Sequence, residues 1–122
     1  MNITIAEDDA AIAQMYMKKL LAHGYTVSVA KDGLEALAVI ERDRPDLLLL
    51  DIKMPKLPGN EVLRRVREAD WGAAIKVIVL TNVSKSEAPQ DFRFLGVDRY
   101  IVKVHYTPTQ VLQIVAEVLQ KK

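Results

Sequence analysis

The chain has 122 residues, the size of one domain and enough to bury a hydrophobic core without disulfides. Its 17 basic and 16 acidic residues leave a net charge of +1, so no broad positive field favours direct nucleic-acid binding or an anionic membrane surface. The absence of cysteine excludes thiolate metal ligands and fits a cytoplasmic location. From the length, we expect one domain over residues 1–122. No apolar run is long enough to cross a bilayer, so we expect no membrane insertion.

The first predicted strand begins at Ile3 and stops at three consecutive carboxylates, Glu7 to Asp9. Three acids in a row do not fit inside a sheet, so we expect them at the C-terminal end of the strand. Asp9 suits the N-cap of a helix that ends before Gly24. The apolar residues expected on the buried side of this helix are Ile12, Met15, Tyr16 and Leu20.

An edge strand is predicted over residues 26–30, where valines alternate with smaller or polar side chains. Asp32 stands three residues before Glu35, which is the spacing of a capping box. It opens a second helix, which must end before Pro45. The apolar residues expected on its buried side are Leu34, Leu37, Val39 and Ile40.

Four consecutive leucines, residues 47–50, run directly into Asp51 and form the most buried strand that the sequence predicts. A short apolar run between chain breakers is typical of a strand covered on both faces. Residues 76–80 form a second such run, which ends at Thr81. Ligand sites in parallel sheets lie beyond the carboxyl ends of strands, so Asp51 is a candidate for chemistry, although an aspartate there also commonly serves a turn.

After the third strand, Pro58 and Gly59 occupy the positions that a type II turn prefers. Asn60 can then cap a helix that runs to about Ala69. The outward side of this helix is mostly charged, so we expect it to face solvent.

The helix after Thr81 must accommodate Pro89. Ser84 and Glu87 have capping-box spacing, but a helix starting there would hold the proline in its interior and lose a hydrogen bond. We therefore expect the helix to begin near Glu87, with Pro89 in its first turn, and to end at Gly96.

Residues 100–102 form the last predicted strand, which delivers Lys103 to its end. Thr107 and Gln110 have capping-box spacing around Pro108 and open the final helix. Its apolar residues are Val111, Leu112, Ile114, Val115, Val118 and Leu119. The alternation of strand and helix predicts a doubly wound α/β fold of the flavodoxin-like kind, with a five-stranded parallel sheet in the order 2-1-3-4-5 and five helices.

The predicted strand ends bring three acids (Glu7, Asp8 and Asp51), the hydroxyl of Thr81 and the ammonium of Lys103 to one edge of the sheet. Clustered carboxylates repel one another unless a hard cation neutralises them, and Mg²⁺ binds through one or two carboxylates plus phosphate. A carboxylate can also attack phosphorus, and the resulting aspartyl phosphate needs metal, ammonium and hydroxyl partners. Taken singly, these residues also fit helix capping, a strand end and an exposed charge. Those roles do not explain their common edge.

From end to end, the chain resembles a response-regulator receiver domain of two-component signalling, as in single-domain chemotaxis regulators. The residues that carry the resemblance are Glu7-Asp8, Asp51 followed by Met54-Pro55, Gly59, Thr81, Tyr100 and Lys103. The resemblance implies that Asp51 accepts a phosphoryl group from a sensor histidine kinase or phosphotransfer protein, with Mg²⁺ as cofactor. It also implies a phosphoprotein that catalyses only its own phosphoryl transfer and slow dephosphorylation.

The resemblance further assigns the metal ligands. Asp8, Asp51 and the backbone carbonyl of Lys53 would hold Mg²⁺ directly, and Glu7 would hold it through water.

The remaining roles concern signalling. Thr81 and Lys103 would contact the phosphoryl oxygens, and Thr81 and Tyr100 would rearrange together as the switch. This would change the surface of the fourth helix, fifth strand and fifth helix for a downstream output protein. The resemblance implies a monomer or weak dimer.

Three positions depart from the family pattern. Val104 follows the lysine where the family usually has proline, and Asn82 follows the threonine where a small residue is usual. Pro58 stands where an acid often precedes the glycine. None of these changes removes a predicted site residue. We expect His23 to be a helix-end residue and His105 a loop residue, rather than metal ligands or phosphate carriers, because neither has a second histidine at metal-site spacing.

Two other kinds of site fit the sequence less well. An aspartate-nucleophile phosphatase typically has a second acid two positions after the nucleophile, where this chain has Lys53. An FMN carrier shares the fold, but acids at the strand ends would repel the FMN phosphate. The alternative that stays open is a receiver-like scaffold or phosphate sink that does not switch.

Overall fold

The computed structural model describes residues 1–120. Its sheet has five parallel strands in the order β2-β1-β3-β4-β5. The strands are β1 (Asn2–Ala6), β2 (Thr26–Ala30), β3 (Leu47–Leu50), β4 (Lys76–Thr81) and β5 (Arg99–Val102). The predicted doubly wound, flavodoxin-like sheet and its strand order are confirmed.

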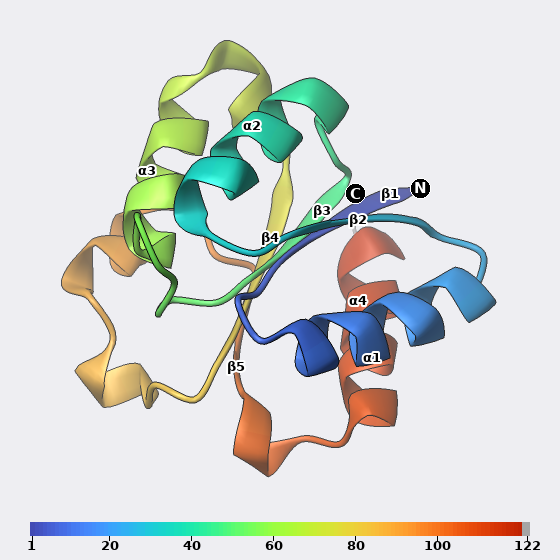
Figure 1. Cartoon of the computed structure of the whole chain (residues 1–122). Helices are drawn as coiled ribbons and strands as arrows, with labels where there is room; N and C mark the ends of the chain where they lie inside the picture. The colour runs from blue at the N-terminus through green and yellow to red at the C-terminus, as the bar shows by residue number, and fades with distance from the viewer. Residues whose placement is uncertain (121–122) are drawn as a thin grey trace.

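Residues 1–120 contain four α-helices, one fewer than predicted, of which three connect strands and the fourth follows β5. They are α1 (Ala10–Ala22), α2 (Gly33–Asp43), α3 (Gly59–Glu68) and α4 (Pro108–Gln120). Figure 1 shows α2 and α3 on one face of the sheet and α1 and α4 on the other. Four short 3-10 helices complete the structure: η1 (Asp70–Gly72), η2 (Lys85–Glu87), η3 (Gln90–Phe94) and η4 (Lys103–His105).

The helix expected from Glu87 to Gly96 is wrong, because this segment forms η2 and η3 instead. The two 3-10 helices are separated by Ala88 and Pro89, which are extended with ψ of 149° and 136°. Proline disfavours the α conformation of the residue before it, so Ala88 cannot continue a helix into Pro89. Pro89 interrupts the helix rather than joining its first turn.

The start of α3 also differs from the prediction. The helix begins at Gly59, with Pro58 rather than Asn60 in the N-cap position. Gly59 does not have the positive φ that a type II turn requires at this position. Glycine is needed here for space, because a Cβ on Gly59 would lie 2.1 Å from the carbonyl oxygen of Asp51. The first turn of α3 therefore packs directly against the backbone that follows β3.

Two predicted helix caps are confirmed. The Asp9 carboxylate accepts hydrogen bonds from the backbone N–H of Ala11 at 3.0 Å and of Ile12 at 3.1 Å. Thr107 and Gln110 form a reciprocal capping box: the Gln110 N–H donates to Thr107 Oγ1 at 3.2 Å, and the Thr107 N–H donates to Gln110 Oε1 at 2.8 Å. Local sequence spacing thus set both helix starts.

The second predicted capping box forms only in part. The Glu35 N–H donates to the Asp32 carboxylate at 2.8 Å. In return, the Glu35 carboxylate accepts from the N–H of Lys31, at 3.3 Å, rather than from Asp32 itself. Asp32 is nevertheless the N-cap of α2, as predicted.

A hydrophobic core lies on each face of the sheet. The central strands β3 and β4 contribute to both cores. One core joins them to α2, α3 and Phe92, and the other joins them, with β1 and β5, to α1 and α4. Met15 and Leu34, expected on buried helix faces, are 36% and 50% exposed. Ala13 and Ala36 are buried on those helices, because small residues fit where helix and sheet approach closely.

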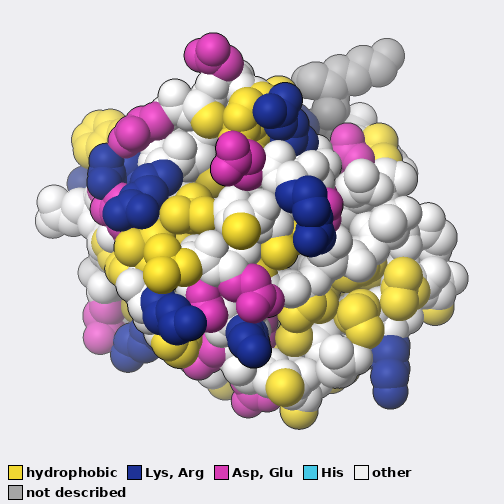
Figure 2. All heavy atoms as spheres, turned by 45° about the horizontal axis from the view of Figure 1, so that its top comes forward, with side chains coloured by type: hydrophobic (Ala, Val, Ile, Leu, Met, Phe, Trp, Pro, Cys, Tyr) yellow, Lys and Arg dark blue, Asp and Glu magenta, His cyan; other side chains and the backbone are white. Residues whose placement is uncertain are grey.

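Charged residues of both signs are spread over the surface. Figure 2 shows acidic and basic side chains interspersed on the face that it views, which agrees with the net charge of +1. Of the helices in the described part of the chain, none combines the length and apolar character that a bilayer crossing requires.

Candidate functional site

The segments that follow β1, β3, β4 and β5 meet at one edge of the sheet, where they line a cavity of about 450 Å³. This arrangement follows from the parallel register, in which Leu50 lies beside both Ala6 and Val79, so the residues after each strand leave at the same edge. The predicted site residues that line the cavity are Glu7, Asp8, Asp51, Lys53, Thr81 and Lys103. The structure therefore brings the predicted phosphoacceptor, metal ligands and phosphoryl contacts together.

Backbone hydrogen bonds place two of the acids. The N–H of Glu7 donates to the Ala30 carbonyl at 2.9 Å, and the N–H of Asp51 donates to the Ala6 carbonyl at 3.0 Å. Both side chains are almost fully buried, with 4% and 8% of each residue exposed. These bonds extend the sheet pairing by one residue, so the carboxylates stand at the floor of the cavity rather than in a mobile loop.

Lys103 links the two buried acids. Its ammonium contacts the Glu7 carboxylate and lies 3.0 Å from Asp51 Oδ2. The other Asp51 oxygen, Oδ1, accepts from the Ile52 N–H at 2.7 Å. One ammonium thus serves two carboxylates, which leaves the cluster with an excess of negative charge.

Three acids also form a candidate metal site. Glu7, Asp8 and Asp51 each offer a carboxylate oxygen within 4.8 Å of the others. Glu7 Oε2 is buried and has no hydrogen-bond partner among the described residues. A buried carboxylate oxygen without a partner is costly, and an all-oxygen donor set is what Mg²⁺ prefers. The residues present therefore fit a Mg²⁺ ion.

The charges at the site shift each other's protonation. Burial, followed by the proximity of Asp51, raises the pKa of Glu7 to about 7. Burial alone would also raise the pKa of Asp51, but the proximity of Glu7 and Thr81 and the charge of Lys103 outweigh burial and lower it. Burial would lower the pKa of Lys103, yet its contacts with Glu7 and Asp51 raise it. At neutral pH, Asp51 is therefore an ionised carboxylate beside a protonated lysine.

Thr81 and Tyr100, the predicted switch pair, contact the same short segment after β4. The N–H of Val83 donates to Thr81 Oγ1 at 3.4 Å, and the Tyr100 hydroxyl donates to the Val83 carbonyl at 2.6 Å. Thr81 is buried and Tyr100 is half-buried. Val83 therefore lies between the cavity and the face of the molecule that carries β5.

Several residues that line the cavity were not predicted as part of the site, among them a hydrogen-bonded pair. Ser84 and Glu87 line the cavity, and the Ser84 hydroxyl donates to the Glu87 carboxylate at 2.8 Å. Their capping-box spacing is visible in the sequence, but that spacing indicates only a helix start. Of the departures from the family pattern, Asn82 also lines the cavity, whereas Val104 is 75% exposed in η4.

Both histidines lie away from the cavity, His23 at a helix end as expected and His105 in a 3-10 helix rather than in the expected loop. His23 is the C-cap of α1, and its Nδ1 is 2.9 Å from the Lys19 carbonyl oxygen. His105 ends η4. Neither belongs to a cluster of metal-ligating side chains within residues 1–120.

Comparison with known proteins gives a consistent result. Residues 3–116 match the family model described as the response regulator receiver domain. Response regulator MprA of Mycobacterium leprae is 41% identical over 106 residues, an alignment that covers 84% of this chain and 44% of that protein. MprA of Mycobacterium tuberculosis strain H37Ra is 40% identical over 105 residues, with the same coverage. The chain thus spans less than half the length of these curated relatives.

Solved structures share the fold over nearly the whole chain. The chemotaxis response regulator CheY4 of Vibrio cholerae has a TM-score of 0.87 and 29% identity, covering 96% of this chain and 97% of that chain. The BeF3-activated receiver domain of RstA from Klebsiella pneumoniae has a TM-score of 0.86 and 28% identity, with coverage of 99% and 100%. A CheY-like receiver domain protein of Methanospirillum hungatei has a TM-score of 0.86 and 32% identity, with coverage of 97% and 92%.

Proposed function

Because this chain belongs to the response regulator receiver domain family, we propose that it is a phosphorylation-dependent switch, with Asp51 as its phosphoacceptor. The family is regulatory and serves two-component signalling. The observation that carries the proposal is the cavity in which Asp51 and Glu7 share the ammonium of Lys103 beside Asp8 and Thr81. We propose that the whole chain is one receiver domain that works in the cytoplasm, as a monomer or weak dimer without direct contact with nucleic acid.

The nucleophile is a carboxylate oxygen of Asp51. The lowered pKa keeps Asp51 ionised at neutral pH, and the Ile52 N–H holds Oδ1. We assign the attack on the phosphorus atom of a phosphohistidine, on the kinase or phosphotransfer protein, to Oδ2, the oxygen beside the Lys103 ammonium. A P–O bond forms as the P–N bond breaks, and the histidine nitrogen leaves with the electron pair of that bond.

The other residues compensate the charge that arrives with the phosphoryl group. Lys103, now in contact with Asp51 Oδ2, is within reach of a phosphoryl oxygen, and the Thr81 hydroxyl can donate to another. We assign Mg²⁺ to Asp8, Asp51 and the Lys53 backbone carbonyl, with Glu7 acting through water. When bound, the ion neutralises negative charge on the carboxylates and phosphoryl oxygens.

Switching would act through Val83. A Thr81 hydroxyl drawn toward the phosphoryl group moves away from the Val83 N–H, while Tyr100 holds the carbonyl of the same residue. The phosphoryl group can shift the equilibrium between two packings only by its different affinity for them. The changed surface around η3, β5 and α4 would then bind a downstream output protein.

The test is phosphorylation by acetyl phosphate with Mg²⁺, followed by intact mass. Wild-type protein should gain one phosphoryl group, and Asp51→Asn should gain none. Asp70→Asn is the matched control, because Asp70 is an exposed acid outside the cavity and should leave the gain unchanged. Phosphorylation of Asp51→Asn at the wild-type rate would show that the acceptor lies elsewhere.

A phosphate sink that does not switch gives a different result. Fluoroberyllate, a mimic of the phosphoryl group, should shift the amide signals of Thr81 and Tyr100 if the domain switches. Unchanged signals with the mimic demonstrably bound would favour the sink.

A further inference from the structure

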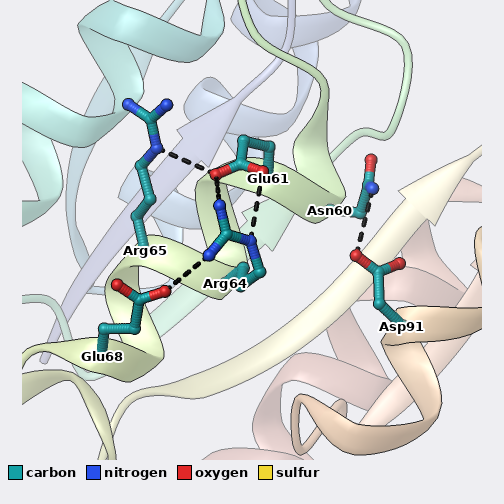
Figure 3. Close-up of polar contacts among 6 residues, drawn as sticks. All are labelled: Asn60, Glu61, Arg64, Arg65, Glu68 and Asp91. Carbon is teal, nitrogen blue, oxygen red and sulfur yellow. Dashed lines mark hydrogen bonds and ion pairs between the residues drawn. The ribbon is translucent and has the colours of Figure 1, made fainter.

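The segment between β4 and β5 is joined to α3 by side-chain contacts at two places. Near its end, the Arg67 guanidinium donates to the carbonyls of Leu95 at 2.7 Å and Gly96 at 2.9 Å. Near its middle, Asn60 Nδ2 donates to Asp91 Oδ2 at 3.2 Å, as Figure 3 shows. η3 therefore has a polar connection to the first turn of α3 as well as to its last turn.

The first turn of α3 is tightly coupled to the phosphoacceptor backbone. Gly59 donates its N–H to the Ile52 carbonyl at 2.7 Å. A Cβ on Gly59 would lie 2.1 Å from the Asp51 carbonyl oxygen, so no gap separates the helix start from this loop. Asn60 follows Gly59 directly and must move when the backbone at Asp51 and Ile52 moves.

The contact with Asn60 pairs only one oxygen of the Asp91 carboxylate. Asp91 Oδ1 is buried and has no hydrogen-bond partner among residues 1–120. An unpaired buried oxygen costs free energy that offsets the single hydrogen bond made by Oδ2. Among residues 1–120, Asn60 thus supplies the one hydrogen bond that the Asp91 side chain makes, so a displacement of Asn60 acts directly on η3.

Arg64, one turn beyond Asn60 on α3, does not complete this contact. Figure 3 shows its guanidinium between Glu61 and Glu68, to which it donates hydrogen bonds. The pKa of Arg64 is raised chiefly by Glu61, and the charge of Asp91 adds to this, so Asp91 lies within electrostatic reach. The two acids on α3 keep this arginine from pairing with Asp91.

We propose that Asn60 and Asp91 form a positioning link that transmits changes at Asp51 to η3. The link runs through Gly59 and α3, and is separate from the path through Thr81 and Tyr100. It rests on the proposed function, since phosphorylation of Asp51 supplies the change that it transmits.

The test uses amide NMR with Mg²⁺ and fluoroberyllate. Asn60→Asp places two carboxylates face to face, so the mimic-induced shifts of residues 90–96 should fall to less than half of their wild-type size. The shifts of Thr81 and Tyr100 should persist, because the other path is intact. The double variant Asn60→Asp with Asp91→Asn rebuilds the pair with exchanged partners and should restore the shifts.

Two further variants separate the link from a general charge effect and from loss of folding. Gln90→Glu adds a negative charge to the same segment at an exposed position and should leave the shifts unchanged. If Asn60→Asp fails to fold, Asn60→Ala removes the hydrogen bond without repulsion and should reduce the shifts in the same residues.

Three outcomes would overturn the link. If the folded Asn60 variant shows mimic-induced shifts of wild-type size, Asn60 does not transmit the change. If the double variant with exchanged partners does not restore the shifts, the effect of Asn60→Asp is a local distortion. Binding of fluoroberyllate is followed separately by ¹⁹F NMR. If wild-type protein binds none, the proposed function and the link fall together, whereas normal binding with either of the first two results removes the link alone.

Discussion

Two crossovers pack into the same hydrophobic core, and they are held there in different ways. The crossover from β3 to β4 is a regular helix, α3, which buries Val62, Leu63 and Val66. The crossover from β4 to β5 forms two 3-10 helices, in which Phe92 is the buried residue. Polar contacts from Asn60, Arg67 and Tyr100 hold it in place.

This difference indicates that the two crossovers beside Asp51, the proposed phosphoacceptor, differ in rigidity. An apolar helix face is stabilised by contacts that persist through small displacements, because dispersion and burial are non-directional. The strength of a hydrogen bond depends on its angle and distance. A segment held by hydrogen bonds therefore responds to small movements of the residues that bond to it. The buried face of α3 is therefore expected to act as a fixed support, whereas the first turn of α3, which carries Asn60, and residues 82–98 are expected to respond.

The largest effect is expected from the core side of α3. Leu63 is fully buried, so Leu63→Ala should lower the free energy of unfolding by about 3 kcal/mol through lost burial and a residual cavity. Urea denaturation measures this, with Arg65→Ala on the exposed side as control and an expected change of about 0.5 kcal/mol. A loss below about 1 kcal/mol for Leu63→Ala would mean that α3 is not the firmer crossover.

The second largest effect is expected where the irregular crossover meets α3. Arg67 also donates to the carbonyls of Gly72 at 2.7 Å and Ile75 at 2.8 Å, so Arg67→Met leaves several carbonyls without a partner. We expect a loss of about 2 kcal/mol and faster amide exchange near Leu95 and Gly96. Arg64→Met, which removes only exposed ion pairs, is the control and should change stability much less than Arg67→Met. Equal exchange rates in the two variants would contradict the assignment.

A smaller effect on stability is expected from Mg²⁺, whose proposed site includes Asp51 at the start of the α3 crossover. Binding by Glu7, Asp8 and Asp51 should raise stability by about 1.4 kcal/mol at ten times the dissociation constant. Because the pKa of Glu7 rises from 4.5 to about 7 on folding, its contribution is present below about pH 4.5 and is lost as the pH rises through about 7. The metal-free protein should therefore lose stability over that range.

Thermal melts test both parts of this expectation. The gain from Mg²⁺ should be larger at about pH 8 than at about pH 6, where the ion must displace a proton from Glu7. Glu7→Gln is the comparison variant, and it should be more stable than wild type without metal at the higher pH while gaining less from Mg²⁺. Melts that do not respond to millimolar Mg²⁺ would argue against the site.

The smallest change in stability is expected from Pro89→Ala. The substitution restores a backbone N–H and frees Ala88 to adopt helical angles. The helical signal in the circular dichroism spectrum should therefore increase. Stability should change by about 0.5 kcal/mol or less, because greater freedom of the unfolded chain offsets the gain. Pro58→Ala, at the existing N-cap of α3, is the control and should leave helix content unchanged. An unchanged spectrum for Pro89→Ala would show that other contacts prevent the helix.

Much of the fold could be predicted from the sequence because it depends on local patterns. Residues 47–50 are buried on both faces in any parallel arrangement, and Asp9 and Thr107 cap helices with partners within three residues. The meeting of Glu7, Asp51, Thr81 and Lys103 at one edge also followed, since parallel strands carry their carboxyl ends to the same side. The roles of these residues remain predictions.

What the tertiary structure decided lies in contacts between segments distant in sequence. The bridge from Lys103 to both Glu7 and Asp51, the bond from Tyr100 to Val83, and the contacts of Asn60 and Arg67 with the 82–98 crossover have no local signature. The sequence predicts a helix in that crossover from near Glu87 to Gly96, with Pro89 in its first turn. It became two 3-10 helices because Pro89 interrupts the pattern, and its final position depends on directional hydrogen bonds that only the packed neighbours supply.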